Sequence, residues 1–596
     1  MSNAAFGLSR LTGNSPALFP KILYAFLISA MLLAGIGPIC GSFIPFDVLH
    51  AKARAVSATG QIPFFTFDFY REIQVRLRLI GALNVALFVI LALMHAPVLR
   101  TIERVLADCR TLGRDIQSAV RLLPAVDLVV VPLLVVFAIL IRTPLLSQPM
   151  RYDEAYTFLQ YSSHPFYVAL SFYNAPNNHL LNTLLVRAAY LTFGNQPWAL
   201  RLPAFLAGVC LAPSTYVASR SLYRPAGALF AAGLVASSSV LIEYSSNARG
   251  YGMVCLAFML LIPLAAYALR YRNWAAWFLF GIVAGIGFYA VPIMLYPFGG
   301  VILWLILSAL AGQPQPPFRD SIIPIFVSAC VTMLLTFELY SPALAVSGPS
   351  SLVANKWVTA NRLPTFLHGL PLSFASTWRD WNRSVPLWLS FILASGFFTA
   401  LILSRRCSRF RIPLVVTLIF WILPLVFIQR VIPFERVWLF ALPLYFLTAA
   451  AGIATVLEFL LPRRHLYAVM TLIALAVSAF IGFRVTSTHS AYLANDCRGL
   501  DAIVKFLKPQ LKPGDSVAVV LPSDIPLYYY FQKEGLPASF INAPTSGRRL
   551  VVVNEAAGDT VSRVLAATKL PGDAATARLL TKDDLASVYE ILPQKP

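Results

Sequence analysis

Long apolar runs recur along most of this 596-residue chain, and they constrain its fold more than any other feature. A helix needs about 20 apolar residues to cross the hydrocarbon core of a bilayer. Hydrophobic residues make up 58% of the chain and charged residues only 12%, which excludes a soluble globular enzyme and a disordered protein. We therefore expect a polytopic helical membrane protein. Runs of suitable length predict about thirteen transmembrane helices, near residues 22–44, 79–97, 125–143, 201–219, 225–243, 250–269, 274–290, 292–312, 321–343, 385–404, 413–430, 436–458 and 466–483.

The arginines between these runs predict how the chain is oriented. Short cytoplasmic loops carry an excess of Lys and Arg. With Met1 in the cytoplasm, every arginine-rich short connection faces the cytoplasm if the segment from His179 to Phe193 lies in the outer interface as an amphipathic helix. The same parity places the loops near 45–78, 144–200 and 344–384, and the tail from Arg484, outside. The arginine-rich connections hold Arg100, Arg104, Arg110, Arg114, Arg121, Arg220, Arg224, Arg270, Arg272, Arg319, Arg405, Arg406, Arg409, Arg411, Arg463 and Arg464.

The tail differs in composition from the rest of the chain. Short β-rich runs at 516–521, 550–553 and 587–592 are separated by helix-like stretches such as 497–511 and 560–568, which predicts a small α/β domain. No glycine-rich nucleotide motif is present there. The net charge of +21 falls mainly on the membrane part, where topology and anionic lipid explain it better than nucleic acid does.

These observations predict three parts. Residues 1–124 form an N-terminal region with two additional transmembrane helices, residues 125–483 form a transmembrane core, and residues 484–596 form the α/β domain outside the membrane. No long internal repeat is visible, which disfavours a transporter built from inverted halves.

Two adjacent acids, Asp153 and Glu154, follow the third predicted span, where the chain leaves the membrane on its outer face. Desolvation and like-charge repulsion can raise the pKa of one member of such a pair, which suits a general base. The alternative is a solvated loop in which an acid pairs with Arg151. On the pair alone, both interpretations stay open.

A second polar stretch runs from Glu243 to Tyr251 in a short outer connection. A charge at membrane depth is costly unless it faces a cavity or a partner. Arg249 could therefore clamp a phosphate, or Glu243 and Arg249 could simply pair with each other. His179 could contact a phosphate or bind a metal, but no spaced second ligand supports metal binding, and the seven cysteines are isolated.

The order of these motifs resembles a known family. Asp153-Glu154-Ala155-Tyr156-Thr157 comes first, then His179 and a segment that ends in Phe193-Gly194, then Ala199-Leu200-Arg201-Leu202-Pro203-Ala204, and finally Glu243-Tyr244-Ser245-x-x-Ala248-Arg249-x-Tyr251. This order is similar to that of the GT-C membrane glycosyltransferases that use polyprenyl-phosphate sugars, the group containing protein O-mannosyltransferases and the lipid A aminoarabinose transferase. The resemblance is specific over about residues 125–270 and absent in the tail.

The resemblance implies an enzyme that moves a sugar from a polyprenyl-phosphate donor to a lipid, glycan or protein acceptor, at the outer face of a bacterial cytoplasmic membrane. It implies that Asp153, with Glu154 beside it, serves as base or positions the acceptor. It also implies that Arg249 and Tyr251 lie near the donor phosphate, with His179, and that Glu243 is the nearest candidate for a second acid. No cofactor is required. A single displacement assisted by one base predicts inversion at the sugar carbon.

The outer loop at 344–384 carries cations and aromatic side chains, including Lys356, Arg362 and Trp378. Such groups suit phosphates and sugar faces, so this loop could cover the site. The alternative is an aromatic and basic belt at the membrane interface.

Two other functions remain open from the sequence. A transporter or flippase for a lipid-linked sugar is expected to hold its ionisable residues near the bilayer midplane, whereas the candidate acids here cluster at the outer ends of spans. An oligosaccharide ligase with a diphosphate donor usually has its large outer loop late in the chain, whereas the acidic loop here comes early.

Overall fold

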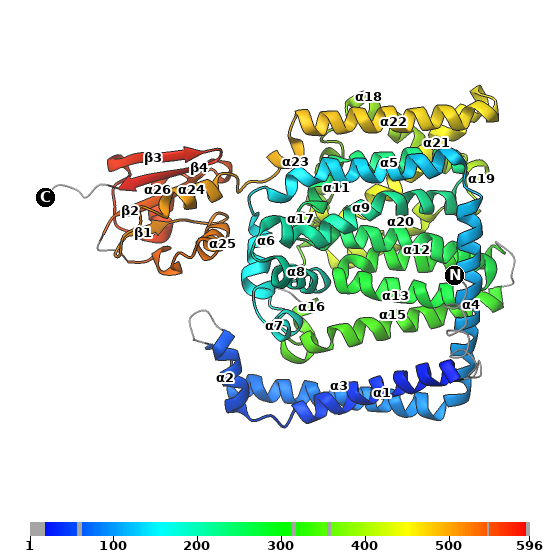
Figure 1. The fold of residues 1–596 in the computed structure, drawn as a ribbon, viewed down its shortest axis with the longest axis horizontal. Helices are drawn as coiled ribbons and strands as arrows, with labels where there is room; N and C mark the ends of the chain where they lie inside the picture. The colour runs from blue at the N-terminus through cyan, green and yellow to red at the C-terminus, as the bar shows by residue number, and fades with distance from the viewer. Residues whose placement is uncertain (1–17, 57–61, 313–317, 354–358, 545–546, 592–596) are drawn as a thin grey trace, which may run out of the picture.

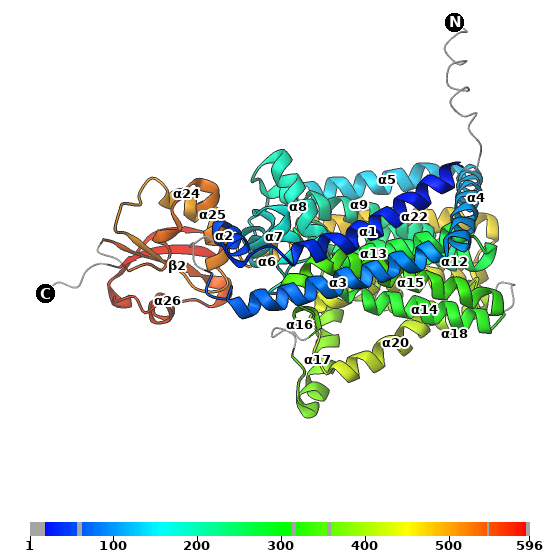
Figure 2. The same ribbon diagram turned by 90° about the horizontal axis from the view of Figure 1, so that it is seen from below.

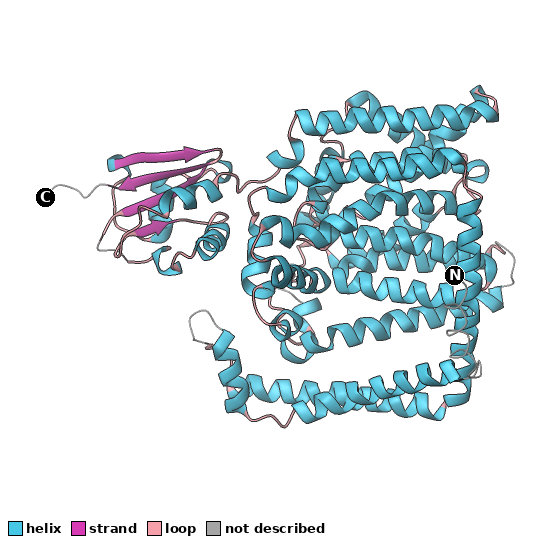
Figure 3. Cartoon of the chain, viewed as in Figure 1, coloured by secondary structure: helices cyan, strands magenta, loops and turns pink. Residues whose placement is uncertain are grey.

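The computed structural model describes residues 18–56, 62–312, 318–353, 359–544 and 547–591. Most of these residues form helices that run side by side, and the strands lie at one end of this bundle (Figures 1 and 3). Within the described ranges, nine helical segments are long and apolar enough to cross a membrane. The helices that form them are α1 (Leu18–Gly41), α3 (Phe67–Leu93), α5 (Ala125–Arg142), α9 (Pro197–Leu222), α12 (Tyr251–Tyr271), α14 (Leu295–Leu310), α15 (Phe318–Val346), α21 (Ala441–Leu460) and α22 (Arg463–Ser487).

A tenth span results if two consecutive helices are counted together. Helices α10 (Ala228–Ser237) and α11 (Ser239–Ser245) follow the short turn η3 (Pro225–Gly227), and the pair bends by 59°. The break is at Ser238, whose backbone is extended with φ −62° and ψ 123°. The run at 225–243 is therefore helical as predicted, but it is not straight. The bend brings the end of α11 to the candidate site.

The remaining three predicted spans are also helices, but each is shorter than eighteen residues. They are α13 (Trp274–Ala290), α18 (Leu387–Ile402) and α20 (Leu414–Gln429). A polytopic helical membrane protein with nine or ten candidate spans is thus confirmed.

Helix α8 (Leu180–Phe193) corresponds to the segment that was expected to lie in the interface. Its axis runs across the long helices instead of along them, as the two views show (Figures 1 and 2). It is anchored to the bundle because the Asn182 side chain donates to the Ala248 carbonyl at 2.8 Å.

Helix α4 (His95–Arg121) crosses the end of the bundle that lies away from the strands (Figure 1). The sequence had indicated only an arginine-rich connection here. Two acids of α4 face the bundle: the Asp108 carboxylate accepts the Trp274 N–H at 2.7 Å, and Asp115 accepts the Tyr267 hydroxyl at 2.6 Å. Helix α4 thereby ties the α1–α3 pair to the core.

Close helix contacts in the bundle depend on small residues. An ideal Cβ on Gly452 in α21 would lie 1.8 Å from the Gly396 carbonyl oxygen in α18. No larger side chain fits between these backbones, and such small-residue contacts are common where helices pack in membranes. Further helices lie between the spans or after the last one: α2 (Phe46–Val56), α6 (Tyr152–Thr157), α7 (Phe166–Ser171), α16 (Ser350–Val353), α17 (Leu363–Trp381), α19 (Ser404–Cys407), η5 (Glu435–Trp438) and α23 (Ser490–Leu493).

The tail forms a four-stranded mixed sheet in the order β1-β2-β4-β3. Strand β1 pairs parallel to β2, whereas β2 and β3 both pair antiparallel to β4. The strands are β1 (Ser516–Ala518), β2 (Arg549–Asn554), β3 (Ala577–Asp583) and β4 (Ala586–Ile591), and the helices are α24 (Leu500–Leu507), α25 (Asp524–Glu534) and α26 (Val561–Thr568).

Two elements of the tail were not predicted. Strand β3 lies at the sheet edge and is largely exposed, so it lacks the apolar run of a buried strand. Helix α25 contains Tyr528-Tyr529-Tyr530-Phe531, residue types that favour strands. It is helical because Leu527, Tyr529 and Phe531 are buried in a common core with Met150 and Phe158, so tertiary packing outweighs local propensity.

Candidate functional site

Asp153 and Glu154 lie in the first turn of α6, at the bundle end nearest the strands (Figure 1). The helix begins after Arg151, whose extended backbone N–H donates to Glu154 Oε2 at 3.0 Å. This bond satisfies a backbone donor at the start of the helix, as the Glu of a capping box does. Because the cap turns Glu154 inward, the neighbouring Asp153 lies on another face of the helix and remains 36% exposed.

The Glu154 side chain is completely buried and fully bonded. Arg201 of α9 donates to both of its carboxylate oxygens, at 2.8 and 2.7 Å, and the Ala248 N–H donates to Oε1 at 2.5 Å. Burial by itself would raise the pKa of Glu154, but Arg201 and the Arg151 N–H hold it below its ordinary value. This carboxylate joins α6 to α9 and to the residue before Arg249, which suits a positioning residue better than a base.

Asp153 faces Arg249 across the site. Asp153 Oδ2 lies 3.5 Å from Arg249 Nη2, while the Arg249 side chain is only 5% exposed. Arg249 also donates to the Asn177 side-chain oxygen. The structure therefore brings together an accessible carboxylate and a buried cation from segments that are far apart in the chain.

His179 lies against Arg249 in an arrangement that leaves two donors facing each other. The Gly250 N–H donates to His179 Nδ1 at 2.9 Å, so the neutral ring carries its proton on Nε2. That nitrogen is 3.4 Å from Arg249 Nη2, which is also a donor. Burial, followed by the charges of Arg249 and Arg436, lowers the pKa of His179 well below 6.5, which keeps the ring neutral. Among the described residues these two adjacent donors have no shared acceptor, an arrangement that suits an anionic oxygen.

Tyr251 and Arg436 complete this side of the site. The Tyr251 ring contacts the His179 ring edge to face, with centroids 4.9 Å apart, and Arg249 lies 5.7 Å from the Tyr251 centroid. Burial opposes the charge of Arg436, but Tyr251, to which it is hydrogen-bonded, and Asp153 raise the pKa of Arg436 above its ordinary value. A second cation from η5 thus lies near Asp153.

Glu243 does not pair with Arg249. Its two oxygens contact Arg151 at 2.5 Å and Arg383 at 2.7 Å, and its side chain is 6% exposed. Arg383 also pairs with Asp380. Glu243 consequently joins α11 to the start of α6 and to the residues after α17, with both oxygens occupied.

Arg362 and Trp378, two of the three residues predicted to cover the site, take part in none of these contacts. Lys356 lies outside the described residues. Arg362 precedes α17 and is exposed, and Trp378 is 41% exposed with its ring against Tyr445. Among the described residues of this loop, Arg383 is the one that reaches the site, through Glu243.

Sequence reasoning gave no role to Arg201, Arg383, Arg436 or Asn177. A signal existed for Arg201 and Arg436, because each is a cation within or beside a long apolar run, where an isolated charge is costly. No local signal pointed to Asn177 or Arg383.

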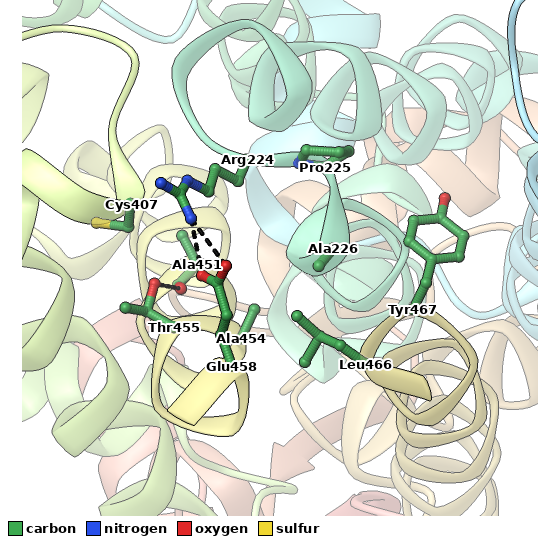
Figure 4. Close-up of a pocket in the computed structure, with 10 residues that line it drawn as sticks. All are labelled: Arg224, Pro225, Ala226, Cys407, Ala451, Ala454, Thr455, Glu458, Leu466 and Tyr467. Atoms are coloured by element: carbon green, nitrogen blue, oxygen red, sulfur yellow. Dashed lines mark hydrogen bonds and ion pairs between the residues drawn. The ribbon is translucent and has the colours of Figure 1, made fainter. Parts of the chain in front are cut away.

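Within the described part of the chain, no group of three or more His, Cys, Asp or Glu side chains could hold a metal ion. A separate cavity lies at the far end of the bundle, where Arg224 Nη1 contacts both oxygens of Glu458 at 2.9 Å (Figure 4). No candidate residue contributes to this cavity. Its lining consists of Arg224, Pro225, Ala226, Cys407, Ala451, Ala454, Thr455, Glu458, Leu466 and Tyr467.

Residues 177–336 match the family described as dolichyl-phosphate-mannose-protein mannosyltransferase. Among curated protein sequences, none matches this chain. The fold is similar to that of ArnT from Cupriavidus metallidurans bound to undecaprenyl phosphate, with a TM-score of 0.52 and 13% identity over 79% of this chain and 99% of ArnT.

Two further solved structures give lower TM-scores. The apo state of the same ArnT gives a TM-score of 0.49 with 13% identity over 78% of this chain and 99% of ArnT. An Archaeoglobus fulgidus oligosaccharyltransferase, in complex with Zn and sulfate, gives 0.39 with 13% identity over 65% of this chain and 56% of its own.

The matched range contains His179, Glu243, Arg249 and Tyr251, and the ArnT-like fold extends over both sides of it. These findings confirm the resemblance that the motif order indicated. The protein has a helical membrane fold similar to that of ArnT, and its residues 177–336 match the family described as dolichyl-phosphate-mannose-protein mannosyltransferase.

Proposed function

We propose that this protein is an inverting glycosyltransferase that moves a sugar from a polyprenyl phosphate to an acceptor at the outer face of a bacterial cytoplasmic membrane. One observation carries this proposal: His179 Nε2 and Arg249 Nη2, both donors, lie 3.4 Å apart beside the accessible carboxylate of Asp153. A phosphate oxygen would supply the acceptor that this pair lacks. The undecaprenyl phosphate bound by ArnT supports the choice of donor.

The proposed mechanism assigns separate tasks to the two sides of the site. Arg249 and the His179 Nε2–H stabilise the charge that develops on the departing phosphate, with Arg436 as a further cation. Asp153 accepts the proton of the attacking acceptor group, a contribution of about 10²–10⁴-fold. The bond between the sugar carbon and the phosphate oxygen breaks as the new glycosidic bond forms, so one displacement inverts the sugar carbon.

Donor binding would also free the base. Asp153 is 3.5 Å from Arg249 in the structure, so a phosphate that binds Arg249 replaces the carboxylate as its counterion. Asp153 is then released from Arg249 and can turn toward the acceptor. Glu154 stays bonded to Arg201 throughout and fixes the helix that carries Asp153.

The membrane arrangement is part of the same proposal. All thirteen predicted spans cross the membrane, with α10 and α11 as one of them, α8 lies in the outer interface, and the arginine-rich end with α4 faces the cytoplasm. Residues 1–124, 125–483 and 484–596 then form an N-terminal unit, the catalytic core and an outer domain.

The activity is tested by the transfer of a radiolabelled sugar from polyprenyl phosphate to membrane acceptors in proteoliposomes. The unaltered protein is expected to form an inverted glycosidic product, and Asp153→Asn is expected to remove most of it. An unaltered protein that moves the intact lipid-linked sugar between leaflets without any transfer would contradict the proposal and support a flippase.

The orientation has its own test in a cysteine-free variant. Cysteines at Asp153 and at Ser562, an exposed residue of α26, are expected to react with a membrane-impermeant thiol reagent added to intact cells. A cysteine at Arg405 serves as the matched control and is expected to stay unlabelled. Labelling at Arg405 alone would show that the protein has the opposite orientation.

A further inference from the structure

The tail from Arg484 contacts Pro149, Met150 and Arg151, the three residues that lead into α6. We propose that this domain positions the catalytic carboxylate, and that Tyr530 is the main positioning residue. This inference rests on the proposed function, because it gives the domain a task in the same reaction.

Three consecutive residues of the loop are bonded from the tail. The Met150 N–H donates to the Tyr530 hydroxyl at 2.8 Å. The Asn495 side chain donates to the Pro149 carbonyl at 2.7 Å, and Arg151 donates to the Ala491 carbonyl at 3.3 Å. The tail thus fixes the peptide group between Pro149 and Met150 and the side chain of Arg151, two to four residues before Asp153.

Apolar packing continues the same contact along α6. Met150, Ala155 and Phe158 belong to one buried cluster with residues of α24 and α25. The Phe158 ring meets the Tyr529 ring edge to face, with centroids 5.5 Å apart. Met150 and Tyr529 are each 0% exposed. The start and the end of α6 therefore both rest on the tail.

The opposite side of α6 is held by the membrane core. Glu154 is bonded to Arg201 of α9, and the two side chains are 0% exposed. Asp153 lies between these two supports, in the turn whose ends they fix. Small displacements of a catalytic group cost rate even when its chemistry is unchanged, so a second support for this turn has a direct consequence for turnover.

A simple cap on the last helix would make different contacts. Tyr530 is 380 positions from Met150 in the chain, and its hydroxyl bonds to the outer loop instead of to α22. The domain follows α22 and α23 in sequence, but its buried cluster is shared with α6 and α8. The Tyr530–Met150 bond and the cluster shared with α6 are the contacts expected of a domain that supports α6.

Helix α25 supplies a matched set of variants, because Tyr528, Tyr529 and Tyr530 are consecutive. Tyr530→Phe removes the acceptor for the Met150 N–H and keeps the ring. Tyr529→Phe removes a buried hydroxyl that has no hydrogen-bond partner among the described residues, and Tyr528→Phe removes a half-exposed one. Each variant retains its aromatic packing, and thermal unfolding checks that each is folded.

The expected result is a fall in kcat of about 2–10-fold for Tyr530→Phe, the size of one ordinary hydrogen bond, with the donor KM nearly unchanged. The other two variants are expected to keep the kcat of the unaltered protein. Separately, a cysteine at Asp153 should react faster with a thiol reagent when combined with Tyr530→Phe than with Tyr529→Phe, because the turn is then less restrained.

Equal kcat values and equal thiol reaction rates across the three variants would overturn the inference while leaving the proposed function intact. If the unaltered protein shows no transfer, the proposed function fails. The thiol rates would then still decide whether Tyr530 positions the turn: a faster reaction with Tyr530→Phe supports positioning, and equal rates exclude it.

Discussion

The two ends of the bundle each hold an aspartate beside arginine and tyrosine side chains, and the clusters differ in how fully the carboxylate is bonded. Asp127, at the end with α4, is 0% exposed and accepts from Tyr216 at 2.5 Å, from Arg220 at 2.8 Å and from the Tyr467 hydroxyl. Asp153 is 36% exposed and has one side-chain contact among the described residues, with Arg249 at 3.5 Å.

This difference distinguishes a carboxylate with a structural role from one that is free to accept a proton. Both oxygens of Asp127 already accept hydrogen bonds from protein donors, two at Oδ2 and one at Oδ1, and the side chain is buried. Asp153 has free acceptor capacity and an open side, which a base requires. The type of residue is the same at both ends, so the packing around each carboxylate decides its role.

The largest expected effect is on turnover and tests this comparison directly. Asp153→Asn should lower the transfer rate by about 10²–10⁴-fold, since it removes the proposed base, with little change in thermal stability. Asp127→Asn is the matched control, and it should lower the melting temperature while the rate per folded molecule stays near that of the unaltered protein. A comparable loss of rate at both positions would break the comparison.

Next in size is the loss of stability when the buried pair at α6 is broken. Arg201→Met leaves Glu154 as an unpaired buried charge and should cost about 3–5 kcal/mol in the free energy of unfolding. Denaturant unfolding of the purified protein measures it. The double variant Arg201→Met with Glu154→Gln should recover part of this loss; no recovery would mean that the pair is not what holds α6.

The binding of the donor lipid should respond more modestly. Arg249→Gln removes a charge-assisted contact to the phosphate, worth about 1.5–3 kcal/mol, and should weaken undecaprenyl phosphate binding by roughly 10–150-fold. Binding can be followed by native mass spectrometry in detergent. Arg220→Gln, at the opposite end, should bind the lipid as the unaltered protein does, and equal losses would place the phosphate elsewhere.

The smallest expected effect is a dependence of stability on pH. The folded state lowers the pKa of His179 below 6.5, so below that pH the unfolded chain binds a proton that the folded protein does not. Stability should therefore fall as the pH drops from 6.5, by at most about 1.4 kcal/mol per pH unit for this group.

His179→Asn is the variant that isolates this effect, because its side-chain oxygen can still accept the Gly250 N–H. Its melting temperature should fall less between pH 6.5 and 5 than that of the unaltered protein. The same slope in both would show that His179 does not carry the effect. Glu154 should lose its contribution to stability only at a lower pH, below its ordinary pKa of 4.5, because the folded state lowers that pKa.

The sequence was enough to identify many residues of the site, but not to predict how they contact one another. Asp153, His179, Arg249 and Tyr251 were identified from their types and order, and the structure brings them together. The distinct environments of Asp153 and Glu154 were not predictable, because adjacent residues on a helix point in different directions and only the docking of α9 decides which one is buried. The pairing of Glu243 with Arg151 and Arg383 likewise depends on contacts across the bundle.

The sequence by itself determined that this is a helical membrane protein with a small sheet domain, because long apolar runs and alternating strands are local properties of the chain. It also predicted an interfacial position for α8, from the parity of the arginine-rich connections. The tertiary structure alone decided the bend at Ser238, the crosswise position of α4, and the contact between Tyr530 and Met150. These features depend on surfaces that meet only after the helices pack, so no local pattern encodes them.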